Sequence, residues 1–194
     1  GGWVVAATGG GGVLRAVDLR WIRRGPPELC GGVGRVAKRR PGARLEIVGD
    51  DGSKPSIDFD RHVAQAGVGD RIRIRSYVSE EELASLYASA QGFAFLSEYE
   101  GFGLTPLEAL SAGVPIVVLD TPVAREIYGN AAAYVAQPDA GLIDAALIEV
   151  ALERVLFNEG ERSRILANAT GVLSRYSWRD CAAKVLDILT SCSR

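Results

Sequence analysis

The chain has 194 residues, of which 47% are hydrophobic and 24% are charged, and its formal net charge is −2. That length is enough for one sizeable domain with its own core, and the near balance of charge gives no broad attraction to nucleic acid or to an anionic membrane. The sequence has no apolar run long enough to span a bilayer and no signal-peptide pattern.

The first 40 residues are the least regular part of the sequence. Residues 1–12 end in the run Gly9-Gly-Gly-Gly12, which lacks the spacing of a phosphate-binding loop, so this segment is expected to be a flexible tail or a vector-derived extension. Residues 13–19 fit a first strand. Residues 27–39 fit a helix, although Gly31, Gly32 and Gly34 predict a poor one.

From residue 41 onward, strands and helices alternate. Strands are expected at 43–48, 71–76, 92–96, 115–119 and 132–135. Helices are expected at 56–66, 79–90, 106–112, 122–128, 142–158, 160–174 and 178–190, the second of them opened by a capping box at 79–82. This alternation predicts an α/β fold with a Rossmann-like, doubly wound parallel sheet.

The most informative stretch is 97–112, which follows the apolar strand at 92–96. It contains two glutamates, Glu100 and Glu108, separated by a glycine turn and a proline-started helix. Thr105 is expected to be the N-cap and Pro106 the first helical residue, with Glu108 at the third position. A strand, a turn and a helix N-terminus in this order lie at the carboxyl edge of a sheet, where ligands bind and free amides attract anions.

Carboxylates on both sides of a phosphate-binding helix end suit a ligand with hydroxyl groups at its two ends and phosphate in the middle, such as a nucleotide sugar. Gly101 and Gly103 would let the backbone approach that ligand closely. Two simpler interpretations remain open. Glu108 completes a capping box with Thr105 and would then only close its helix, and Glu100 would be a solvated loop acid.

The run Glu-Gly-Phe-Gly-Leu-Thr-Pro-Leu-Glu at 100–108 resembles the E-x7-E signature of family-four retaining glycosyltransferases, which have the GT-B fold. The resemblance continues through Ser111-Ala-Gly-Val-Pro115, the strand segments at 44–50 and 71–80, and Tyr176-Ser-Trp178, and it covers residues 41–190. It implies the C-terminal, donor-binding half of a GT-B enzyme. A whole GT-B enzyme is about twice as long, and the chain contains no methionine, so we expect a fragment.

The resemblance also implies roles for individual residues. Glu100 would hold the sugar hydroxyls and Glu108 the ribose, while the backbone of the loop between them would face sugar and phosphate. The loop residues concerned are Gly101, Phe102, Gly103, Leu104 and Thr105.

Four further residues are candidates for the donor site. Arg24, in the nearest counterpart of the family's Lys-Gly, would neutralise charge on the leaving diphosphate, or else belong to a solvated basic turn. Backbone groups of Tyr77 and Val78 would meet the nucleotide base, although a tyrosine there could equally cap the edge of the core. Ser97 would hydrogen-bond either phosphate or its own turn.

These expectations define a nucleotide-sugar-binding domain at 13–176 and a C-terminal helix at 177–194 that would brace an absent N-terminal domain. The implied function is transfer of a hexose from a UDP- or GDP-sugar with retention of configuration, without a metal or an organic cofactor. The acceptor (a sugar, lipid or glycan) and any peripheral membrane contact would belong to the absent half, and no nucleic acid is expected. The alternative is a non-catalytic sugar-nucleotide-binding or assembly module.

The cysteines bear on location. Cys30, Cys181 and Cys192 have no metal-ligand spacing, and an odd count argues against a disulfide framework. They therefore favour a reducing compartment, and a cytoplasmic location is expected.

Overall fold

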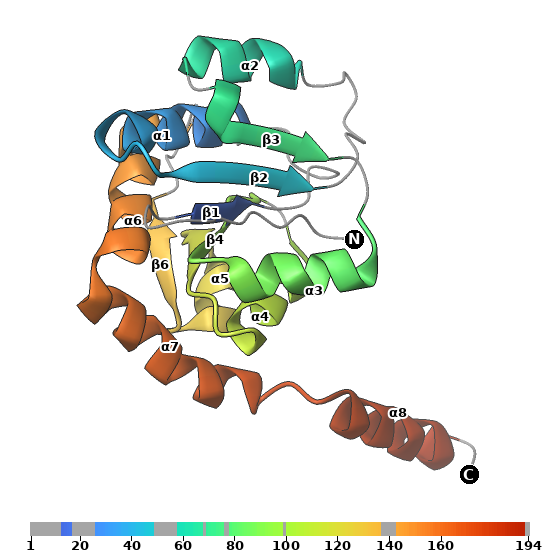
Figure 1. Cartoon of the computed structure of the whole chain (residues 1–194). Helices are drawn as coiled ribbons and strands as arrows, with labels where there is room; N and C mark the ends of the chain where they lie inside the picture. The colour runs from blue at the N-terminus through green and yellow to red at the C-terminus, as the bar shows by residue number, and fades with distance from the viewer. Residues whose placement is uncertain are drawn as a thin grey trace.

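The computed structural model describes residues 13–16, 26–48, 58–67, 69–75, 78–98, 100–136 and 143–192. Its centre is a six-stranded parallel sheet with the strand order β3-β2-β1-β4-β5-β6 (Figure 1). The strands are β1 (Val13–Ala16), β2 (Arg44–Val48), β3 (Ile72–Arg75), β4 (Gly92–Phe95), β5 (Ile116–Leu119) and β6 (Ala132–Val135). The order reverses between β1 and β4, as in a doubly wound sheet.

Helices cover both faces of the sheet, α1, α2 and α6 on one side and α3, α4 and α5 on the other (Figure 1). Their bounds are α1 (Pro26–Arg39), α2 (Phe59–Ala66), α3 (Glu80–Ser89), α4 (Leu104–Ser111), α5 (Pro122–Tyr128), α6 (Ala145–Phe157), α7 (Glu159–Leu173) and α8 (Trp178–Cys192), with a 3₁₀ turn at Gly69–Arg71. The predicted fold class is therefore confirmed. None of the described helices is both long and apolar enough to cross a bilayer.

Several local predictions are confirmed. Ser79 caps α3 by accepting a hydrogen bond of 3.2 Å from the amide of Glu82, and Gly67 ends α2 in the left-handed conformation. The strand at 132–135 and the helix at 122–128 have the predicted bounds. The predicted tail at 1–12 lies outside the described residues, as do the ends of the strand expected at 13–19 and of the helix expected at 56–66.

The helix expected at 27–39 is present as α1, and the glycines that predicted a poor helix face neighbouring helices. A Cβ on Gly32 would lie 2.6 Å from Cγ2 of Ile148 on α6, and one on Gly34 would lie 3.1 Å from the carbonyl oxygen of Ala66 on α2. A methyl group at Gly32 would force its neighbours to shift, and one at Gly34 would be unusually tight. Tertiary packing against α6 and α2 therefore outweighs the low helix propensity of glycine in α1.

The core lies on both faces of the central strands. Every residue of β4 and β5 is buried, as expected for parallel strands covered by helices on each side. Phe93 and Ile116 are completely buried at the centre. This packing fixes the carboxyl ends of β4 and β5, where the candidate site begins.

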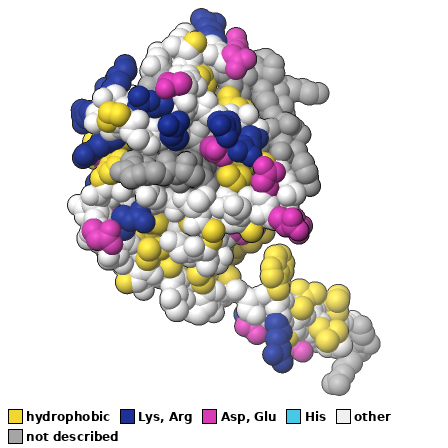
Figure 2. Space-filling view, viewed as in Figure 1, with side chains coloured by type: hydrophobic (Ala, Val, Ile, Leu, Met, Phe, Trp, Pro, Cys, Tyr) yellow, Lys and Arg dark blue, Asp and Glu magenta, His cyan; other side chains and the backbone are white. Residues whose placement is uncertain are grey.

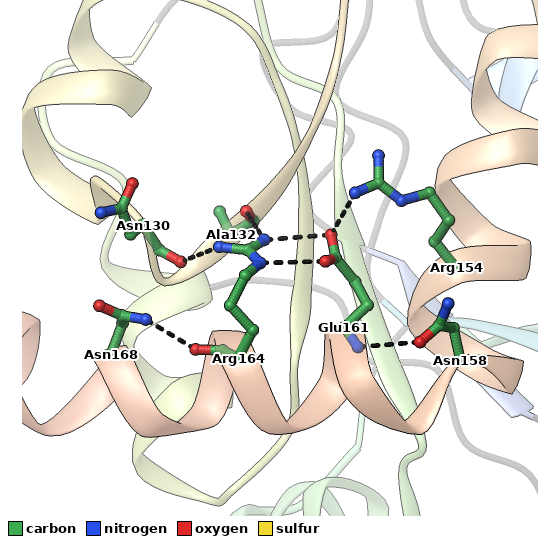
Figure 3. Close-up of polar contacts among 7 residues, drawn as sticks. All are labelled: Asn130, Ala132, Arg154, Asn158, Glu161, Arg164 and Asn168. Atoms are coloured by element: carbon green, nitrogen blue, oxygen red, sulfur yellow. Dashed lines mark hydrogen bonds and ion pairs between the residues drawn. The ribbon is translucent and has the colours of Figure 1, made fainter.

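A polar network joins α6 and α7 to the turn before β6 (Figure 3). Arg164 donates hydrogen bonds to the backbone carbonyls of Asn130 (2.6 Å) and Ala132 (3.1 Å) and pairs with Glu161 at 2.9 Å. Arg154, from α6, contacts the same carboxylate at 2.8 Å. The two guanidinium groups lower the pKa of Glu161, and the hydrogen bond from Arg164 is the largest contribution.

Helix α8 projects away from the rest of the protein at the end of α7 (Figure 1). Its apolar side chains are exposed and gather in one patch in the space-filling view (Figure 2). Trp178 is 79% exposed, and Val185, Leu186, Ile188 and Leu189 are each more than half exposed. A contiguous apolar surface of this kind is unusual on a free monomer.

Candidate functional site

The candidate site lies at the carboxyl ends of the central strands. β4 pairs with β1 on one side and with β5 on the other, so the loop that follows it lies beside the point where the strand order reverses. In doubly wound sheets this point forms a crevice between loops that leave in opposite directions. The loop at 96–103 carries Glu100 to one wall of this region and leads directly into α4.

The start of α4 differs from the prediction. Thr105 is not the N-cap, because the helix begins at Leu104 with Gly103 as its N-cap, at φ 82° and ψ 66° and without a side-chain cap. Pro106 therefore occupies the third helical position, where its missing N–H loses no intrahelical bond. The left-handed conformation of Gly103 starts the helix two residues early, which a capping pattern of side chains does not reveal.

This shift removes the capping interpretation of Glu108. The residue stands at the fifth position of α4, past the first turn, and that turn contains no acidic side chain. The carboxylate instead accepts a hydrogen bond of 3.3 Å from the hydroxyl of Tyr87 on α3. Glu108 is exposed, whereas Tyr87 is buried. The positive end of α4 is thus left without an acid of its own, which favours an external anion there.

Glu100 lies over a small hollow at the ends of β4 and β5. The hollow holds about 240 Å³ of space that is partly open to solvent. Two of the predicted residues, Ser97 and Phe102, also line it, and Ser97 is buried. The remaining lining residues are Phe95, Val118, Leu119, Thr121, Val123, Ala124 and Tyr128. Glu100 is close enough for its charge to act on the phenol of Tyr128.

Two aromatic side chains hold the loop before α4. The hydroxyl of Tyr128, at the end of α5, donates a hydrogen bond of 2.8 Å to the carbonyl oxygen of Gly103. The ring of Phe102 meets that of Tyr176 edge to face, with centroids 4.9 Å apart. Because Tyr176 lies between α7 and α8, this pair connects the loop to the joint from which α8 departs.

The structure brings most of the predicted loop residues together, and a few predictions lie elsewhere. Arg24 and Tyr77 lie outside the described residues. Val78 follows β3 at the carboxyl end of the sheet. Its side chain packs against the core, which leaves its backbone for a ligand. Gly101 is exposed, and its backbone is not left-handed. Of the two loop glycines, Gly103 has the left-handed conformation.

Sequence reasoning missed the three tyrosines that contact this loop or α4. Tyr87 and Tyr128 lie 21 and 25 residues from their hydrogen-bond partners, and a contact over such a separation leaves no local pattern. A weak signal was available for Tyr176, because it belongs to the aromatic-Ser-Trp segment that carried part of the resemblance. Nothing in that segment indicates that its ring meets Phe102.

The strand order, the fully parallel sheet and the glycine turn into α4 define a Rossmann-like domain. The same fold occurs in sucrose-phosphate synthase from Thermosynechococcus elongatus, which aligns with a TM-score of 0.77 at 20% identity over 94% of this chain and 46% of that one. Residues 25–172 match the family described as "Glycosyl transferases group 1". The chain therefore belongs to this glycosyltransferase family, and the resemblance inferred from its motifs is confirmed.

Curated relatives include two bacterial mannosyltransferases. The chain is 30% identical over 171 residues to the GDP-mannose:cellobiosyl-diphosphopolyprenol alpha-mannosyltransferase of Xanthomonas oryzae pv. oryzae (strain PXO99A), covering 87% of this chain and 44% of that protein. It is 35% identical over 116 residues to the O-antigen chain mannosyltransferase B of Escherichia coli, covering 60% of this chain and 29% of that protein. The chain thus spans less than half of the length of these relatives.

Proposed function

We propose that the chain is the donor-binding part of a retaining glycosyltransferase that moves a hexose from a nucleoside-diphosphate sugar to an acceptor. One observation carries this proposal. Glu100 and Glu108 flank an acid-free helix N-terminus at the carboxyl end of the central strand β4. A partially positive helix end between two carboxylates matches a ligand that is anionic in its middle and bears hydroxyl groups at both ends.

Each residue would then have a distinct part in binding the donor. Glu108 would accept hydrogen bonds from the ribose hydroxyls, with its carboxylate oriented by the phenol of Tyr87. The amides of Leu104 and Thr105 would face the diphosphate, because the first amides of a helix have no intrahelical acceptor. Glu100 would accept hydrogen bonds from the sugar, on the far side of the glycine turn.

The chemical step would depend on stabilising the leaving diphosphate as the sugar departs. Negative charge grows on the bridging oxygen when the glycosidic bond breaks, and preorganised donors are most effective against charge that develops in the transition state. We propose that Arg24 and the N-terminus of α4 supply these donors, and that this half of the enzyme needs neither a metal nor an organic cofactor. The acceptor would be bound by an N-terminal domain.

Helix α8 is our candidate for the contact with that second domain. We propose that residues 13–176 form the donor domain and that residues 177–194 brace its partner. The exposed apolar patch of α8 supports this division, since burying such side chains is favourable by roughly 25 cal/mol per Å² of apolar surface. The isolated chain would accordingly bind a donor and transfer nothing.

We further propose a cytoplasmic location. Cys30, Cys181 and Cys192 are all free thiols, which fits a reducing compartment. Because the name of the relative from Xanthomonas oryzae contains GDP-mannose, a GDP-hexose is the first donor to test, before UDP-sugars.

Titration calorimetry of the 194-residue chain with GDP-mannose, UDP-glucose and ADP-glucose tests the proposal. We expect one of these ligands to bind, and Glu108→Gln to weaken it by roughly 1.5–3 kcal/mol through loss of charge-assisted hydrogen bonds. The unfolding free energy should hardly change, because Glu108 does not cap α4.

Glu126→Gln is the matched control, since it makes the same change on an exposed position of α5. The proposal fails if none of the three ligands binds. The ribose assignment fails if Glu108→Gln and Glu126→Gln bind the nucleotide as the parent does.

A further inference from the structure

Tyr128 is a buried phenol whose hydroxyl donates a hydrogen bond to the loop at 96–103, which is called the donor loop below. The residue ends α5 and is 2% exposed, and its hydroxyl donates to the Gly103 carbonyl at 2.8 Å. Burying a hydroxyl group away from water is unfavourable unless it is paired. The hydrogen bond to Gly103 therefore holds the ring and the loop in one arrangement.

The loop packs directly against this phenol. Gly103 has a left-handed backbone, and a Cβ at this position would overlap the Tyr128 hydroxyl and lie 3.8 Å from the ring of Phe95. The contact thus depends on a glycine at 103 and on a hydroxyl at 128 together. Burial raises the pKa of Tyr128, and the nearby charge of Glu100 raises it further, so the phenol keeps its proton and remains a donor at neutral pH.

This hydrogen bond helps to fix where the next amide points. The carbonyl of Gly103 and the N–H of Leu104 belong to one planar trans peptide, in which the two groups point in opposite directions. The Gly103 carbonyl is held by Tyr128 and, as the carbonyl of the N-cap, by the first intrahelical hydrogen bond, so the N–H of Leu104 points away from both donors. This N–H is the first amide of α4 and has no acceptor within the helix.

We propose that Tyr128 is a positioning residue of the donor site, which aims the Leu104 amide at the diphosphate by anchoring the Gly103 carbonyl. This inference rests on the proposed function and assigns the hydroxyl a task beyond packing. It also predicts a ligand dependence that differs from that of Glu100. Loss of the Tyr128 hydroxyl should lower the affinity for every ligand that carries the diphosphate, with or without a sugar.

The test compares Tyr128→Phe with Tyr134→Phe. Each change removes one hydroxyl that donates to the backbone. The hydroxyl of Tyr134 donates to the carbonyls of Gly129 (2.7 Å) and Ala124 (3.3 Å), which belong to α5 and its C-cap, whereas that of Tyr128 donates to the donor loop. Amide hydrogen exchange is measured on the 194-residue chain without ligand. We expect exchange at Leu107 and Glu108, the amides that close the first turn of α4 onto the carbonyls of Gly103 and Leu104, to rise about fivefold in Tyr128→Phe, the equivalent of one hydrogen bond. Exchange at both should stay at the parent rate in Tyr134→Phe.

The second readout is the affinity for GDP and GDP-mannose by calorimetry. Tyr128→Phe should weaken both ligands by a similar factor of about five, and Tyr134→Phe should weaken neither. The proposal is overturned if exchange at Leu107 and Glu108 is unchanged in Tyr128→Phe, or if it rises equally in both variants. If the parent binds no nucleotide and the loop still loosens only in Tyr128→Phe, the anchoring stands and the proposed function fails. If the parent binds GDP and Tyr128→Phe changes neither readout, the anchoring fails and the function stands.

Discussion

Two glycine-to-alanine changes in helices should have opposite effects on stability. In an open helix this change stabilises by up to about 1 kcal/mol, because alanine loses less backbone freedom on folding. Gly171 on α7 is such a position, with nothing within 4 Å of a Cβ. We therefore expect Gly171→Ala to raise the free energy of unfolding by about 0.5–1 kcal/mol.

Gly32 on α1 is the opposite case. A Cβ there would lie 2.6 Å from Cγ2 and 2.9 Å from Cβ of Ile148, and 3.3 Å from the carbonyl oxygen of Ala145. Ile148 is completely buried, and a rotamer change cannot move its Cβ. Overpacking of this kind costs about 1–3 kcal/mol. After subtracting the helix gain of up to about 1 kcal/mol, we expect Gly32→Ala to lower the free energy of unfolding by up to about 2 kcal/mol.

Urea unfolding of the parent and of both variants at 25 °C measures the two effects. The denaturant slope should stay constant, so that the midpoints report stability directly. The reasoning is refuted if Gly32→Ala is as stable as the parent or more stable. It would then follow that Gly32 on α1 does not lie as close to Ile148 on α6 as these distances require.

Two further predictions concern ionisable groups. Contacts with arginine, the hydrogen bond from Arg164 first, lower the pKa of Glu161 from its usual 4.5. The ionised carboxylate therefore contributes its full stabilisation above pH 4.5. This stabilisation is lost as the pH falls through the folded-state pKa. The stability difference between the parent and Glu161→Gln should shrink on acidification below about pH 4.5 in urea unfolding, and a difference that grows would contradict this. Burial raises the pKa of the Cys30 thiol to about 12, so a thiol reagent should label exposed Cys181 and Cys192 quickly at pH 8 and reach Cys30 only on unfolding.

Local patterns were sufficient to predict the elements of this fold. Alternating apolar strands and capped helices predicted every described strand and helix to within a few residues, because burial on both faces of a parallel sheet requires continuous apolar runs such as that of β4. The packing role of the α1 glycines was missed because propensity describes an isolated helix. Whether Gly32 weakens α1 or lets it approach α6 depends on residue 148, which is distant in the sequence.

The candidate site was predictable only in part for the same reason. The glutamates and the glycine turn are close in sequence, so their spacing indicated them. The start of α4 depended on a left-handed Gly103, which in turn depends on contact with Tyr128 from another helix. No pattern within 97–112 contains that information, and the capping box at Thr105 therefore gave a wrong boundary.

The central claim is that the loop before α4 binds a nucleotide sugar, and Glu100 provides its most direct test. Calorimetry compares Glu100→Ala with Glu98→Ala, a matched change in the same loop, using GDP-mannose and GDP. We expect Glu100→Ala to weaken GDP-mannose about tenfold or more, roughly 1.4 kcal/mol, while the affinity for GDP and both affinities of Glu98→Ala stay near those of the parent. An equal loss for both ligands in Glu100→Ala, or a loss for neither, would contradict the claim that this carboxylate binds the sugar.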